Sequence, residues 1–130
     1  MRFFCPGCWK DFAEDLKHCP FCGLDIGGFY ASRDYVEKLI VGLSHPHQTT
    51  QIRAAEILGR IGDERAVQPL IKLVGRADYV YIARAAIVAL GMICHPAGQE
   101  FLASLLTHPV EAIREAAGAA VSYQDMAPPP

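Results

Sequence analysis

The chain has 130 residues, of which 52% are hydrophobic, and a formal net charge of -2 at pH 7. This length allows one ordinary domain, or a small domain with a minimal appendage, and the hydrophobic content excludes general disorder. Because the charge is slightly negative, the composition does not favour binding to nucleic acid or to an anionic membrane surface.

The N-terminal segment FCPGCWKDFAEDLKHCPFCG, residues 4–23, contains two Cys-x-x-Cys pairs separated by ten residues. Zinc accepts four thiolates in a tetrahedron, and each short pair lets one turn supply two ligands and backbone N–H groups that point at the sulfurs. Ten residues are enough for a hairpin that brings the two turns together. Four thiolates leave no open position for a catalytic water, so the predicted zinc site is structural. Its ligands are Cys5, Cys8, Cys19 and Cys22.

Three alternatives to a four-cysteine zinc site have weaker support in the sequence. Iron sites of the rubredoxin type also use Cys-Pro-x-Cys-Gly turns, although these usually lie far apart in a larger aromatic core. A redox-active dithiol needs one Cys-x-x-Cys motif in a βαβ setting, which this segment lacks. His18 could replace Cys19 as a ligand, but we expect it to be only a neighbour.

The doubled cysteine pattern of residues 3–26 resembles the short zinc ribbons found at the ends of many archaeal and bacterial proteins. The resemblance implies a small β-hairpin module with zinc as its cofactor. This sequence departs from the pattern at Trp9, where the first turn usually has glycine. That glycine commonly has a positive φ, which is costly for a bulky residue. We therefore expect a distorted turn, or a Trp9 that is kept for its apolar surface.

The composition changes at Gly27 and Gly28, after which aliphatic residues recur at helical spacing. We therefore expect a zinc ribbon in residues 1–28 and a helical domain in residues 29–126. Residues 127–130 contain three prolines and are expected to form a disordered tail.

Six helices in three pairs are expected in the helical domain, because apolar residues recur three and four positions apart. Ser32 and Asp63 are the expected N-caps of the first and third helices. Pro69 should bend the third helix or delay its regular part, since it removes one backbone donor. The expected helices begin near Ser32, Gln51, Asp63, Tyr79, Pro96 and Pro109.

The helical region also repeats itself. Arg53, Arg84 and Arg114 recur at intervals of 31 and 30 residues, and the Leu-Gly pairs at 58–59 and 90–91 recur at 32. A period of this size, with two short helices per unit, indicates an α-solenoid. We expect the three arginines to bond to carbonyls or acids in the turns between repeats.

The stretch AAEILGRIGDERAVQPLIKLV, residues 54–74, resembles the short HEAT-like repeats named after phycobilisome lyases. The resemblance covers about residues 33–123 and implies a mainly α fold, a three-unit HEAT-like solenoid. Val121-Ser122 stands where the third unit would have Leu-Gly, which suits a terminal repeat. Proteins with such repeats include bilin lyases, hydroxylases and scaffolds. The di-iron hydroxylases use His-Glu pairs, a dipeptide that this sequence lacks.

The segment YVYIARAAIVALGMIC, residues 79–94, is apolar on nearly every face, with Arg84 as its only charge. Such a helix must be buried by something, either by the neighbouring repeats or, on its outward face, by a partner or a second copy of the chain. The residues expected to contact a partner are Trp9, Tyr81, Arg84, Val88 and Met92.

The remaining cysteine and four of the histidines are expected to have structural roles. Cys94 is expected to be a small buried hydrophobic residue. His45, His47, His95 and His108 mostly adjoin prolines and are interpreted as turn or cap residues rather than as a second metal site.

The sequence contains no phosphate-binding loop, no Ser-His-Asp order and no convincing carboxylate pair, so we do not expect an enzyme. We also expect no signal peptide and no membrane span, and hence a cytoplasmic protein. The predicted function is an adaptor that binds a protein partner through the groove lined by the second helix of each repeat. A homodimer is compatible with this prediction, and nucleic acid is not an expected partner. The alternatives are a bilin-lyase-like enzyme and a nucleic-acid-binding protein that acts through the ribbon.

Overall fold

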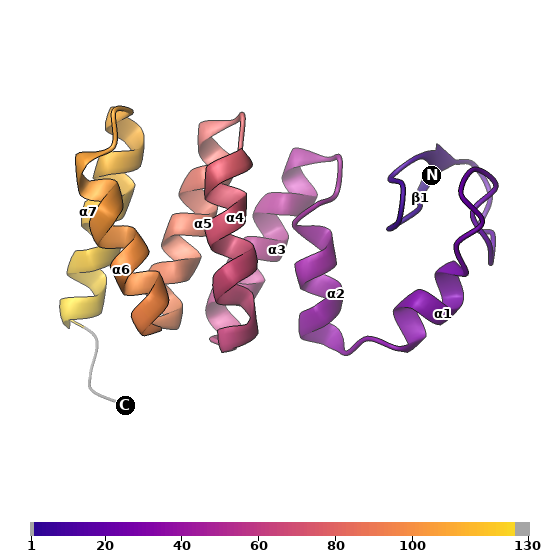
Figure 1. The fold of residues 1–130 in the computed structure, drawn as a ribbon, viewed down its shortest axis with the longest axis horizontal. Coiled ribbons are helices and arrows are strands. Elements are labelled where there is room, and N and C mark those ends of the chain that lie inside the picture. The colour runs from indigo at the N-terminus through magenta and orange to yellow at the C-terminus, as the bar shows by residue number, and fades with distance from the viewer. Residues whose placement is uncertain (1, 127–130) are drawn as a thin grey trace.

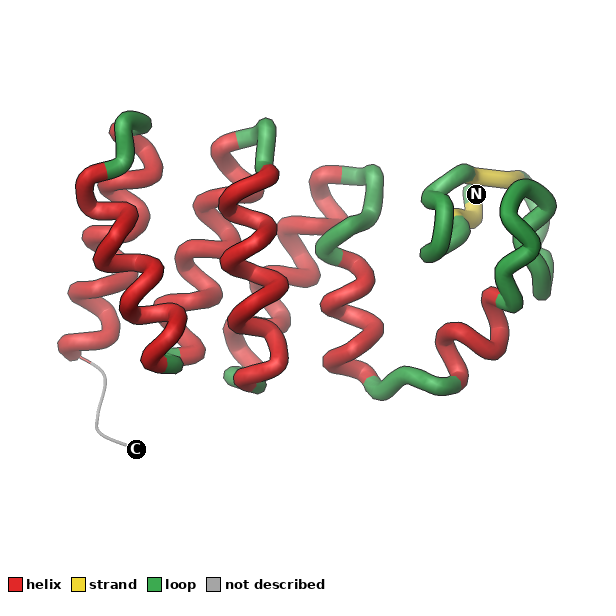
Figure 2. The backbone as a smooth tube through the Cα atoms, viewed as in Figure 1, coloured by secondary structure: helices red, strands yellow, loops and turns green. Residues whose placement is uncertain are grey.

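The computed structural model describes residues 2–126, and the expected tail at residues 127–130 lies outside this described part. A small module of turns with two short strands occupies one end, and paired helices occupy the rest (Figures 1 and 2). In chain order the elements are β1 (Phe3–Phe4), β2 (Asp11–Phe12), α1 (Ile26–Ala31), α2 (Tyr35–Gly42), α3 (Gln48–Ile61), α4 (Val67–Arg76), α5 (Val80–Ile93), α6 (Pro96–Ser104) and α7 (Glu111–Met126).

Helices α2 to α7 form three pairs in two layers, with α2, α4 and α6 in one layer and α3, α5 and α7 in the other (Figure 1). Within the second layer, α3 packs along α5, and α5 packs along α7. The predicted mainly α solenoid, preceded by a cysteine-bearing hairpin, is therefore confirmed.

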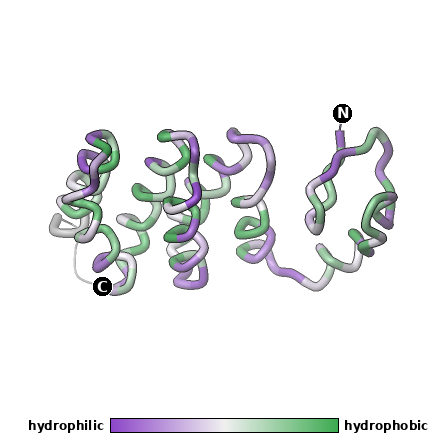
Figure 3. Tube along the Cα trace, turned by 45° about the horizontal axis from the view of Figure 1, so that its top comes forward, coloured by the Kyte–Doolittle hydropathy of each residue, from purple (hydrophilic) through white to green (hydrophobic). Residues whose placement is uncertain are grey.

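The hydrophobic core runs along the interior of these pairs. Its largest fully buried side chains include Leu58, Leu70, Ile87 and Leu90, and complete burial of each stabilises the fold by about 1.5–3 kcal/mol. Hydrophobic residues occur along the helices of the solenoid, whereas the segment between α1 and α2 is hydrophilic (Figure 3). Helix α5 contacts α3, α4, α6 and α7, which explains why its sequence is apolar on most faces.

The glycines of the Leu-Gly motifs allow the second helices to approach closely. A Cβ on Gly91 of α5 would come within 2.9 Å of the Cβ of Ala120 in α7. Gly59 of α3 faces Ala89 of α5 in the same way. Ser122, which replaces glycine in the third unit, is exposed. The repeated glycine is thus explained by contact between successive repeats.

The cap of α2 differs from the prediction. Asp34, not Ser32, is the N-cap: its carboxylate accepts a hydrogen bond from the backbone N–H of Glu37 at 2.9 Å, and the Glu37 side chain accepts one from the N–H of Asp34 at 3.3 Å. This reciprocal arrangement is a capping box. Ser32 instead ends α1. The predicted cap at Asp63 is confirmed, since its side chain accepts from the N–H of Arg65.

Pro69 delays its helix as expected. A 3-10 turn at Glu64–Ala66 precedes α4, so Pro69 lies in the first turn of the α-helix. The N–H groups of a first turn have no partner within the helix, and proline therefore removes no hydrogen bond there. Two further helices begin within three residues of the expected points, α3 at Gln48 and α7 at Glu111.

Three His-Pro turns share one hydrogen-bond pattern. The Nδ1 atoms of His45, His95 and His108 each accept the backbone N–H two residues later, at 3.0, 3.1 and 3.0 Å. These histidines therefore satisfy donors next to a helix start, which confirms their interpretation as turn or cap residues.

Cys94 is not buried, contrary to the expectation. It ends α5 in a left-handed conformation with φ 56°, and this turns the residue out of the apolar face. Its Sγ lies 3.1 Å from the carbonyl oxygen of Gly91.

The predicted arginine contacts are confirmed at one position of three. Arg114 donates to the carbonyl oxygen of His108 at 2.7 Å, whereas Arg53 and Arg84 have no hydrogen bond or ion pair within residues 2–126. The bonds between the first two repeats come instead from Arg76, which donates to the carbonyl oxygen of Leu43 at 2.9 Å, and from Arg65, which pairs with Asp34 at 2.8 Å. None of the described helices is long and apolar enough to span a membrane.

Candidate metal centre and binding groove

The hairpin brings the two cysteine turns together. Strand β1 pairs antiparallel with β2, and each turn is closed by the same backbone hydrogen bond. The N–H of Trp9 donates to the carbonyl of Cys5 at 2.7 Å, and the N–H of Gly23 donates to the carbonyl of Cys19 at 3.0 Å. The sequence thus builds the same turn twice, and each turn presents its two cysteines to the other.

The four sulfur atoms of Cys5, Cys8, Cys19 and Cys22 lie within 4.8 Å of one another. The Sγ atoms of Cys5 and Cys22 are 3.5 Å apart, and those of Cys8 and Cys19 are 3.7 Å apart. A tetrahedron with metal–sulfur distances of about 2.3 Å places its sulfurs roughly 3.8 Å from each other. The observed spacing therefore fits a tetrahedral thiolate site for a metal ion. His18 is not part of this group.

Backbone N–H groups surround two of the sulfurs. The N–H of Gly7 points at Cys5 Sγ at 3.3 Å, and those of Phe21 and Cys22 point at Cys19 Sγ at 3.4 Å. Donors in these positions stabilise thiolates and orient them toward a shared metal.

The same neighbours shift the pKa values of two cysteines in opposite directions. Burial opposes ionisation of Cys19, but hydrogen bonds from the backbone of Cys22 and Phe21 and from neighbouring thiols lower its pKa to about 6. The backbone of Leu24 lowers the pKa of Cys22, but this is outweighed by Cys5, by burial and by the other cysteines, which raise it to about 12. Ionisation of one thiol therefore disfavours ionisation of its neighbours, and a bound cation would offset the repulsion between the thiolates.

Trp9 has φ 60°, and Gly23, its counterpart in the second turn, has φ 79°. The first turn is therefore not distorted, contrary to one of the two expectations, because Trp9 adopts the positive φ that glycine has in the second turn. The Trp9 ring lies 5.2 Å from the ring of His45, centroid to centroid, and the Phe4 ring lies 4.5 Å from it. The N-terminal module thus packs on the turn between α2 and α3.

A groove of about 740 Å³ lies on α3 and α5. The structure brings the expected partner-contact residues Tyr81, Arg84, Val88 and Met92 together in this groove, whereas Trp9 lies elsewhere. Tyr81 and Val88 are 54% and 48% exposed, which is high for large apolar side chains.

The α3 side of the groove was not anticipated from the sequence. Ile52, Glu56 and Arg60 line it, together with Tyr79 at the start of α5. The signal for the α3 residues was their spacing of four, which places them on one face of the helix. That spacing does not by itself indicate which neighbouring helix the face adjoins.

A family model of HEAT repeats matches residues 36–122. The chain belongs to the HEAT-repeat family. The match covers the paired helices from α2 into α7 and leaves out the cysteine module. No curated protein matches the chain. A HEAT domain is a scaffold of stacked helix pairs, so the groove on α3 and α5 lies between second helices of successive repeats.

Proposed function

We propose that this HEAT-repeat protein is a non-enzymatic adaptor that binds a protein partner in the groove on α3 and α5. The observation that carries this proposal is the exposure of Tyr81 and Val88 within a concave surface. Exposed apolar side chains that gather in a groove usually mark a site of interaction with another molecule. HEAT repeats, which typically mediate contacts between proteins, support the same function.

The charges in the groove define the kind of partner. Arg60 and Arg84 line it with a single acid, Glu56, and none of the three forms an ion pair within residues 2–126. The groove therefore has a net positive charge beside an apolar floor. An amphipathic helix with acidic residues flanking its apolar face complements this arrangement, because helices bind grooves through apolar residues three and four positions apart.

The cysteine module is proposed to bind zinc at Cys5, Cys8, Cys19 and Cys22, with a structural role. The sulfur spacing, the N–H donors and the closed set of four ligands support a structural metal, since a catalytic zinc keeps one position for water. Cysteines that bind a metal must not form disulfides, which is typical of a reducing compartment. We therefore propose a cytoplasmic location.

The groove is tested with an acidic amphipathic peptide that carries a fluorescent label. We expect saturable binding that is lost in Val88→Asp and weakened at least roughly tenfold in Arg84→Glu, because reversing a paired charge costs more than 1 kcal/mol. Gln68→Asp changes the charge by the same amount as Val88→Asp. Gln68 is an exposed residue of α4 outside the groove, so this variant should bind normally.

Two results would contradict the proposal. Equal binding by all variants would place the peptide elsewhere on the molecule. Light scattering that shows a dimer for the wild type and a monomer for Val88→Asp would assign the groove to a second copy of the chain instead of a separate partner.

A further inference from the structure

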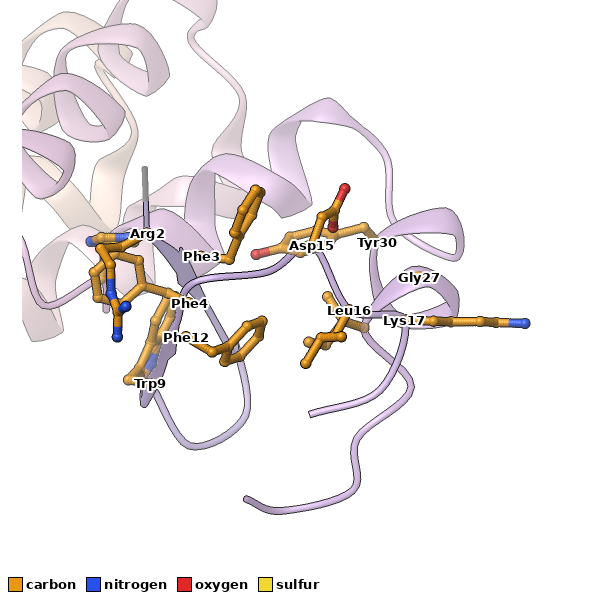
Figure 4. Close-up of a pocket in the computed structure, with 12 residues that line it drawn as sticks. Arg2, Phe3, Phe4, Trp9, Phe12, Asp15, Leu16, Lys17, Gly27 and Tyr30 are labelled. Atoms are coloured by element: carbon orange, nitrogen blue, oxygen red, sulfur yellow. The ribbon is translucent and has the colours of Figure 1, made fainter. Parts of the chain in front are cut away.

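A second cavity, of about 630 Å³, lies between the hairpin and α1, apart from the groove (Figure 4). Aromatic rings make up about half of its lining residues and include Phe3, Phe12 and Tyr30. This volume falls in the range of about 300–1,000 Å³ that is typical of small-molecule sites. Neither the structural metal nor the groove on α3 and α5 accounts for this cavity.

The aromatic walls come from three separate elements. Phe3 of β1 and Phe12 of β2 are cross-strand partners, so their side chains leave the hairpin on the same side. Tyr30 of α1 faces them across the cavity (Figure 4). Phe12 is buried, at 8% exposure, while Phe3 and Tyr30 are half-buried. The electron-rich faces of such rings attract cations.

The charges at this cavity favour a positive ligand. Asp15 lines it and has no ion pair or hydrogen bond among the described residues. Of the two cations in the lining, Arg2 is neutralised by Asp11, whose carboxylate lies 2.8 Å from its Nε. Figure 4 shows the Lys17 side chain extending away from the aromatic rings.

The titratable rings of the lining add no charge at neutral pH. Burial, and the nearby charge of His47, lower the pKa of His45, which therefore is neutral. Burial also raises the pKa of Tyr30, so its hydroxyl keeps its proton. The acidic residue of the lining that has no ion pair among the described residues is thus Asp15.

We propose that this cavity binds a quaternary ammonium group. A primary ammonium has three N–H donors that need acceptors when they leave water, and the only oxygen acceptors among the side chains of the lining are the Asp15 carboxylate and the Tyr30 hydroxyl. A trimethylammonium group has no N–H donor and gains both apolar burial and attraction to the rings. Its source is either a methylated lysine side chain or a choline headgroup, which carry the same cation.

The test is a calorimetric titration of the zinc-loaded full chain with choline, phosphocholine and a trimethyllysine peptide. The reference ligand is the choline isostere in which a neutral tert-butyl group replaces trimethylammonium. We expect the cation to bind at least roughly tenfold more tightly than this isostere. Tighter binding of the peptide would assign the cation to a protein side chain, and tighter binding of phosphocholine would assign it to a lipid headgroup.

Two variants locate the site. Asp15→Asn should weaken choline binding. Glu14 is also exposed but lies outside the lining, so Glu14→Gln should leave binding unchanged. Zinc content and circular dichroism establish that both variants are folded. The proposal is wrong if the tert-butyl compound binds as well as choline, or if no ligand saturates the folded protein.

Discussion

Gly59 and Ala89 lie so close that a Cβ built on the glycine would come 2.9 Å from the Cα of Ala89 and 3.1 Å from its Cβ. The first of these atoms belongs to the backbone, so rotation of a side chain cannot relieve the contact. Helices α3 and α5 would have to move apart to accept any larger residue at position 59.

Gly59→Ala should therefore destabilise the protein by about 1–3 kcal/mol, even though alanine favours helix formation by up to about 1 kcal/mol. Gly118→Ala in α7 is the matched control, because a Cβ at that position would meet no described atom within 4 Å outside the backbone of its own helix. The control should be neutral or slightly more stable. Urea denaturation measures both, and equal effects of the two substitutions would contradict the close-packing explanation.

Metal analysis of the purified protein should find about one zinc per chain, bound by four cysteines. Cys8→Ser should lose the metal, whereas Cys94→Ser, which lies outside the sulfur group, should retain it. A preparation that contains mainly iron would overturn the assignment to zinc.

Chelation should unfold the N-terminal module and leave the helices largely intact. Metal binding supplies roughly 10 kcal/mol or more in small sites of this kind, while the HEAT repeats have a hydrophobic core of their own. Trp9 is the sole tryptophan, so its fluorescence reports the module and far-UV circular dichroism reports the helices. Loss of both signals together would show that the module is part of the solenoid's stability.

Trp9→Gly should relieve the strain of a positive φ and remove the ring that contacts His45. We expect unchanged zinc content and faster amide hydrogen exchange in the turn between α2 and α3, because that turn loses its aromatic cover. Phe21→Gly removes an exposed ring that does not contact the solenoid turn, and it should leave exchange in that turn unchanged. Slower exchange in Trp9→Gly would contradict a packing role for the tryptophan.

Acid should weaken the contact between the first two repeats. The pKa of Asp34 is lowered by the N–H of Glu37 and by Arg65, and the pKa of Asp63 is lowered by Arg65. The two carboxyl groups therefore bind protons less tightly in the folded chain than in the unfolded chain. Their ionised forms stabilise the fold above about pH 4, and this stabilisation is lost as the pH falls below that value.

Melting temperatures measured across this range should fall less in Arg65→Met than in the wild type. The difference should be small and sensitive to salt, because the ion pairs are exposed. Lys72→Met removes an exposed lysine of α4 without an ion pair within residues 2–126 and should keep the wild-type acid dependence. Identical pH profiles for all three proteins would contradict this role of Arg65.

Features with a clear spacing signal in the sequence could be predicted, whereas features without such a signal could not. Cys-x-x-Cys spacing determines how one turn presents two sulfurs, and the repeat period determines a stack of helix pairs. The cap at Asp34 was not predicted because α1 contains two glycines and was not recognised as a helix. Ser32 ends α1, so α2 begins only after Asp34. The exposure of Cys94 follows from a left-handed residue that apolar periodicity does not reveal.

The groove was predicted only in part for a related reason. Val88 and its neighbours on α5 are visible as an excess of apolar residues in one helix. The contribution of Glu56 and Arg60 depends on which face of α3 adjoins α5, and that is determined by the contact of Gly59 with Ala89.

The glycine contacts also affect the shape of the molecule. They draw α3, α5 and α7 together, whereas α4 and α6 touch much less extensively. Unequal spacing of this kind bends a stack of helix pairs toward its more tightly spaced layer, and the small rotation from each unit to the next sets the curvature. The groove on α3 and α5 therefore lies in the more closely packed layer of the stack. A methyl group added at Gly59 would push these two helices apart, so one residue affects both how firmly two repeats hold together and how wide the groove between them is.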